Sequence, residues 1–109
     1  MLRAYLIGAF GKTLRRMARD NGITCNTGFT GIYNPNKKML DRYLMRRFMV
    51  SAQEGTIMMC HPGIVDDELR QLDSLIEPRE HEYNFLTSDM FVELLPELGV
   101  RLSRWSEIS

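Results

Sequence analysis

The stretch at residues 56–63, TIMMCHPG, is the strongest indication of the fold. Its first five residues are mostly apolar without alternation, which predicts a strand covered on both faces, as in a parallel sheet. His61 follows where parallel α/β folds carry their working residues. Pro62 confines it to extended backbone geometry, and Gly63 lets the chain turn. The stretch predicts either a functional imidazole, for a metal ion or a proton transfer, or a histidine that caps the strand by bonding to backbone.

Helical patterns precede this strand. Apolar residues at helical spacing predict a first helix that ends at Asn21-Gly22 and a second over 37–53, capped by Asn36 and ended by Gly55. The predicted inward stripes are Leu2, Leu6, Phe10, Leu14 and Met17 in the first helix, and Leu40, Tyr43, Leu44, Phe48 and Ala52 in the second.

Three shorter helices are expected after the strand. Asp66 or Asp67 can cap a helix that extends to residue 75, and Pro78 opens another over 79–86. Residues 87–89, Thr-Ser-Asp, offer a cap for a helix over 90–98.

Short strands are predicted at 23–25 and 100–105, with a long loop at 26–36. Helices between short strands imply right-handed crossovers, so the fold class is α/β with a mostly parallel sheet. A three-stranded parallel sheet would leave edges open, and no strand precedes the first helix. Residues 1–109 are therefore expected to form a single partial domain of a larger α/β fold.

The composition excludes several classes of protein. The chain has 109 residues, of which 44% are hydrophobic, and 14 basic residues balance 14 acidic ones. This balance gives no reason to expect nucleic acid or an anionic membrane as a partner. No apolar segment is long enough to span a membrane. The start, MLRAYLIGAF, lacks a small-residue cleavage site, and Cys25 and Cys60 are too few for a disulfide scaffold, so a cytoplasmic location is expected.

Five stretches carry a family resemblance: FTGIY (29–33), MCHPG (59–63) with Asp66 after it, PREHEY (78–83), LTSD (86–89) and GVRL (99–102). Together they resemble the C-terminal half of the YdjC-like carbohydrate deacetylases, and the nearest branch is the one associated with hopanoid biosynthesis. The resemblance extends from about Phe10 to Trp105.

The resemblance implies a deformed (β/α) barrel that removes an acetyl group from an amino sugar or glycolipid with a divalent metal, zinc or magnesium. In that family an N-terminal aspartate, a mid-chain histidine and the histidine of the His-Pro-Gly motif hold the metal. Only the last has a counterpart here, His61. The family's N-terminal aspartate pair is absent, so no catalytic residue is assigned. The chain is expected to be inactive alone, to bind no metal by itself, and to associate with a missing N-terminal half.

Other residues match the family or border the predicted site. Arg79 and Glu82 match its arginine and glutamate, and either bind substrate or form an ion pair, being three residues apart. Phe29 and Gly31 could line a sugar site, although Phe29 could equally fill the core. His81 is expected to be exposed and has no assigned role.

A second interpretation belongs to another class of protein. The chain could be a small non-catalytic α/β binding module that kept the scaffold and forms a homodimer through its exposed sheet edge. Such a module should fold alone, and a metal should not change its melting temperature.

Overall fold

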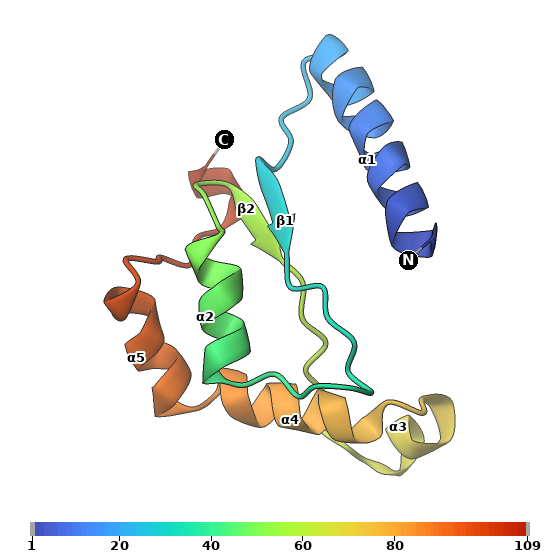
Figure 1. Ribbon diagram of the computed structural model, residues 1–109, viewed down its shortest axis with the longest axis vertical. Coiled ribbons are helices and arrows are strands. Elements are labelled where there is room, and N and C mark those ends of the chain that lie inside the picture. Colours follow the sequence, from blue (N-terminus) through green and yellow to red (C-terminus); the bar gives the residue numbers. More distant parts are fainter. Residues whose placement is uncertain (1, 109) are drawn as a thin grey trace.

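The computed structural model describes the backbone of residues 2–108 and the side chains of residue 8 and residues 10–108. Figure 1 shows two short strands near the middle, helices on one side of them, and the first helix standing apart. The elements in chain order are α1 (Leu2–Asp20), β1 (Gly28–Thr30), α2 (Arg42–Val50), β2 (Thr56–Met58), α3 (Asp67–Leu72), α4 (Ile76–Leu86), α5 (Asp89–Glu97) and the 3-10 helix η1 (Trp105–Glu107).

The sheet consists of β1 and β2, which run parallel with Phe29 opposite Ile57. Thr27 N–H donates to the Gly55 carbonyl at 3.0 Å and Met59 N–H to the Thr30 carbonyl at 2.9 Å, which extends the ladder at both ends. The α/β class and the parallel pairing are confirmed. The strand predicted at 23–25 is wrong, because residues 28–30, not 23–25, lie in register with β2.

The strand predicted at 100–105 is also wrong. Residues 100–104 have no regular structure, and residues 105–107 form η1. The physical reason lies at the end of α5, where Gly99 adopts a φ of +65° and Val100 N–H donates to the Leu95 carbonyl at 2.8 Å. That hydrogen bond completes the C-terminus of the helix, so the amide is not available to begin a ladder.

Helix α2 begins later than predicted. Asp41, not Asn36, is its N-cap, and the Asp41 carboxylate accepts from Leu44 N–H at 2.7 Å. Before it, Lys37 and Lys38 donate their N–H groups to the Asn34 carbonyl and form a turn instead of a helix.

The hydrophobic core lies between α2, α4 and α5 (Figure 1). Its buried members are Leu40, Leu44, Met45, Met49, Phe85, Phe91 and Leu94. Tyr43, predicted to face inward, is instead 71% exposed.

At the surface, the Glu97 carboxylate forms ion pairs with both Arg42 and Arg46, which connect α5 to α2.

The three helices predicted after β2 are present, but α3 ends at Leu72 and not at the predicted residue 75, because Asp73 adopts an extended backbone. The Asp66 carboxylate caps α3 by accepting from Leu69 N–H at 2.8 Å, and Ser88 caps α5. Helix α4 begins ahead of the predicted start, which places Pro78 in its first turn, where its missing N–H is not needed.

Helix α1 confirms the first predicted helix, but its apolar stripe is not buried. Phe10 is 74% exposed, Leu14 68% and Met17 57%. The predicted stripe members Leu2 and Leu6 lie outside the described side chains. The Arg15 guanidinium donates to the Thr27 carbonyl at 3.2 Å and connects α1 to the segment before β1.

We expect Gly31→Ala to destabilise the protein by about 2 kcal/mol more than Gly99→Ala. Both glycines have positive φ, +95° and +65°, but a Cβ at residue 31 would lie 2.3 Å from the Met59 carbonyl oxygen, whereas a Cβ at residue 99 meets nothing within 4 Å. Urea unfolding of the two variants measures the difference. Equal losses would mean that backbone conformation alone, and not the contact with Met59, requires the glycine.

Candidate functional site

The predicted site lies where β1 and β2 end, in the loops that follow both strands. His61 follows β2, and its side chain is exposed. Gly63 N–H donates to the Arg79 carbonyl at 3.1 Å, which fixes the His-Pro-Gly turn on α4. Among the described side chains and backbone groups, the His61 imidazole makes no hydrogen bond or ion pair, so the alternative in which this side chain caps the strand through backbone is not seen.

Glu82 connects the two loops to α4. Its side chain is 2% exposed, and it is a buried charged residue beside the core. One carboxylate oxygen accepts from the Tyr33 hydroxyl, in the loop after β1, and the other accepts from the backbone N–H of His61. Charge-assisted bonds to both oxygens offset the cost of burying the carboxylate. Glu82 therefore sets the position of the His61 backbone relative to Tyr33.

Two neighbouring acids are kept protonated by this arrangement. Burial, and then the adjacent Glu82 carboxylate, raise the pKa of the Tyr33 hydroxyl well above its ordinary value. Partial burial and the charge of Glu82 also raise the pKa of the Cys60 thiol. Both groups therefore favour their protonated forms next to the buried Glu82 carboxylate.

Arg79 pairs with Asp73, not with Glu82 as the ion-pair alternative expected. Arg79 Nε lies 2.5 Å from an Asp73 carboxylate oxygen, and the guanidinium also points at the His61 carbonyl at 3.5 Å. The backbone N–H of Leu75, and then Arg79, lower the pKa of the Asp73 carboxyl. Arg79 thus reaches the base of the His61 loop while Asp73 holds it in place.

The other predicted site residues have different surroundings. Phe29 is 52% exposed, so the prediction that it fills the core is wrong, whereas Gly31 is buried against the backbone of Met59. His81 is exposed as expected, but its Nε2 lies 2.7 Å from the Leu40 carbonyl and must donate to it. Cys25 is half-buried and is a free thiol.

Tyr33 and Asp73 also belong to this site, through their contacts with Glu82 and Arg79, and the sequence did not predict either of them. Tyr33 is the last residue of the stretch at 29–33, which was the only signal for it. Its partner is 49 residues away along the chain, so no local pattern indicates the pair.

A metal fits these residues poorly. In the part of the chain that the structure describes, no three side chains of His, Cys, Asp or Glu come together as a metal site. A catalytic zinc takes three protein ligands and an open position. His61 is thus one candidate ligand and not a complete site.

Among the described residues, no helix has the length and apolarity needed to cross a membrane.

The fold and these contacts define an α/β protein with an exposed histidine three residues after a parallel strand, its backbone held by Glu82. The model of the YdjC-like protein family matches residues 2–97, and the chain belongs to that family. It is 26% identical over 94 residues to a carbohydrate deacetylase of Vibrio cholerae, covering 84% of this chain and 37% of that protein. It is also 30% identical over 91 residues to a carbohydrate deacetylase of Halalkalibacterium halodurans, covering 68% of this chain and 38% of that protein.

The chain therefore spans less than two fifths of the length of these relatives. No solved structure matches it significantly. The predicted YdjC-like membership is confirmed, whereas membership of the hopanoid-associated branch and the barrel remain predictions.

Proposed function

We propose that the chain is part of a metal-dependent carbohydrate N-deacetylase, which hydrolyses the acetamide of an amino sugar or glycolipid to acetate and a free amine. The observation that carries the proposal is the loop after β2, where Glu82 holds the backbone of His61 and leaves its imidazole exposed. Family membership and the two deacetylase relatives supply the reaction class. The glycolipid substrate follows from the resemblance to the hopanoid-associated branch.

In this proposal each residue of the site has a distinct task. His61 is one ligand of a zinc or magnesium ion, and further ligands come from protein beyond the described residues. Phe29 offers an exposed ring on which a sugar can stack. Arg79 binds substrate at the rim, while Gly31 and Glu82 shape the strand-end loops that border it. The chain alone is then inactive.

Exposed apolar residues on the sheet and on α1 support the proposal that this chain packs against further protein. Phe29 and Ile57, opposite each other on the sheet, are 52% and 45% exposed, and the stripe of α1 is exposed as well. We infer that a complementary part of a barrel covers these faces. A second copy of the chain is the alternative occupant, and that arrangement corresponds to the non-catalytic dimerisation module. Cys25 and Cys60 are both free thiols, which suits a reducing cytoplasm.

A chimera tests the proposal. The matched segment of the Vibrio cholerae carbohydrate deacetylase is replaced by the corresponding residues of this chain, and acetate release from an N-acetylated amino sugar is measured. We expect activity from the chimera and none from this chain alone. A folded chimera that binds metal but releases no acetate would contradict the proposal. A chain that forms a stable dimer whose melting temperature ignores added metal would favour the dimerisation module.

A further inference from the structure

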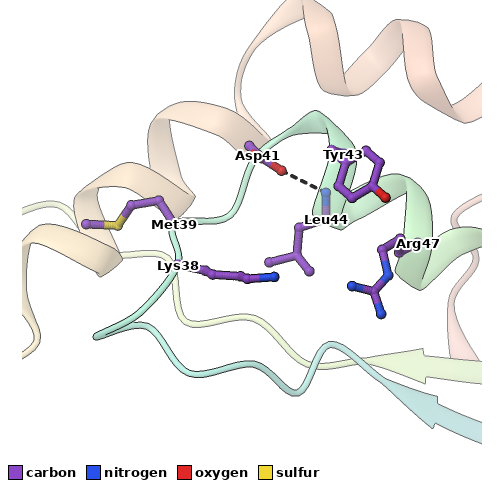
Figure 2. Close-up of a pocket in the computed structure, with 6 residues that line it drawn as sticks. All are labelled: Lys38, Met39, Asp41, Tyr43, Leu44 and Arg47. Atoms are coloured by element: carbon purple, nitrogen blue, oxygen red, sulfur yellow. Dashed lines mark hydrogen bonds between the residues drawn. The ribbon is translucent and has the colours of Figure 1, made fainter.

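Two adjoining hollows lie between the segment after β1 and helix α2. Their volumes are about 300 and 460 Å³, and both are bordered by Lys38, Leu44 and Arg47. Figure 2 shows the smaller one, where the Lys38 and Arg47 side chains extend toward each other below Leu44. We call the pair the Lys38–Arg47 hollow. Neither His61 nor Arg79 borders it.

The cations of this hollow are not neutralised by ion pairs. Lys37 borders the larger part beside Lys38 and Arg47. On α2, Arg46 is paired with Glu97, but among the described residues no ion pair engages the three cations of the hollow. Cationic side chains that border one cavity without acidic partners create a local positive potential that an anion can relieve.

Among the described residues, Asp41 is the one acidic residue that borders the hollow, and it does not cancel this potential by pairing with a cation. The Asp41 carboxylate accepts from Leu44 N–H at 2.7 Å and so caps α2. A carboxylate in that position offsets the positive end of the helix dipole. The remaining positive potential therefore belongs to the lysine and arginine side chains and not to the helix terminus.

Aromatic rings border the same space. Tyr43 is 71% exposed on the smaller part of the hollow (Figure 2). Tyr33 and Phe48 border the larger part, with their ring centroids 6.3 Å apart. Ligand sites combine apolar walls with a few placed polar groups, and the rings supply such a wall here.

We propose that the Lys38–Arg47 hollow binds the anionic group of a small molecule: a phosphate, a sulfate or a carboxylate. The planar guanidinium of Arg47 matches such oxyanions with two parallel N–H donors, and Lys38 contributes a mobile point charge. The Tyr43 ring contacts the remainder of the ligand. This site is independent of deacetylation, and either can fail without the other.

The test is a titration of the full protein with inorganic phosphate at constant ionic strength, followed by NMR. We expect saturable shifts of the Lys38, Tyr43 and Arg47 resonances. Arg47→Gln should weaken binding about tenfold, because it removes a charge-assisted contact. Arg46→Gln is the matched control, since Arg46 lies on the same helix outside the hollow, and it should leave the affinity unchanged.

Two further probes identify the source of the anion. Tighter binding of glycerol 3-phosphate than of inorganic phosphate supports the proposal with an organic phosphate as ligand, whereas equal binding would overturn the Tyr43 contact in favour of a free anion. Binding only to vesicles that contain anionic phospholipid would overturn it in favour of a membrane surface. Shifts that do not saturate, or an equal loss in Arg46→Gln, would overturn it in favour of nonspecific screening.

Discussion

The Glu82→Leu protein should be less stable than wild type by about 4 kcal/mol. Leucine fills much of the volume, but it leaves the Tyr33 hydroxyl and the His61 N–H without their acceptor. Both hydrogen bonds are part-buried, so each donor left without its acceptor costs roughly 1–3 kcal/mol, and the relief from no longer burying a charge offsets only part of this loss. Urea unfolding followed by circular dichroism measures the change in the free energy of unfolding.

Glu82→Gln separates loss of hydrogen bonding from loss of charge. The amide oxygen can accept from His61 N–H while the amide NH₂ donates to the Tyr33 oxygen, so this variant should lose much less stability than Glu82→Leu. Glu80→Leu, at an exposed position of the same helix, should change stability by no more than about 0.5 kcal/mol. Equal stabilities of Glu82→Leu and Glu80→Leu would refute the connecting role of Glu82.

His61→Ala in the active chimera should reduce metal affinity and acetate release by about a hundredfold or more. Loss of a residue that only supports a metal ligand already costs about 10- to 100-fold, so loss of a ligand should cost at least as much. The fold should survive, because the exposed imidazole packs against nothing that the core needs and the His61 N–H contact to Glu82 is made by the backbone. Metal content and turnover are measured on the same preparation.

His81→Ala is the matched control for His61→Ala. The chain has two histidines, and the His81 ring bonds to the Leu40 carbonyl instead of facing the strand ends. We expect this variant to keep its metal content and to lose only some stability. Unchanged metal content and turnover in His61→Ala would rule out His61 as a ligand.

Features encoded by neighbouring residues could be predicted from the sequence. Asp66, one of the two caps expected for α3, is its cap, and the Thr-Ser-Asp stretch at 87–89 contains the cap of α5, Ser88, because a capping side chain bonds to an amide three residues ahead. The position of His61 after β2 was predictable for a similar reason, since an apolar run followed by Pro-Gly is a contiguous signal.

Features that depend on distant partners could not be predicted in this way. Strand β1 has only three residues, one of them a glycine, and its pairing with β2 fixes its place. The predicted inward face of α2 placed Tyr43 inside in place of Met45, because apolar spacing alone does not show which side of the helix meets α4 and α5. Family resemblance pointed to Glu82 as a substrate-binding residue, which stays a prediction, and its contact with Tyr33 exists only in three dimensions.

The isolation of α1 implies that this protein need not unfold in a single cooperative step. A helix of 19 residues is long enough to form transiently by itself, but isolated helices of this length remain marginal in water without a packed face. The core between α2, α4 and α5 does not draw on the described stripe of α1, so α1 can fray while that core persists. If another protein surface covered the stripe, α1 would unfold together with the core. The helical order of α1 would then show whether the protein is assembled with its partner surface.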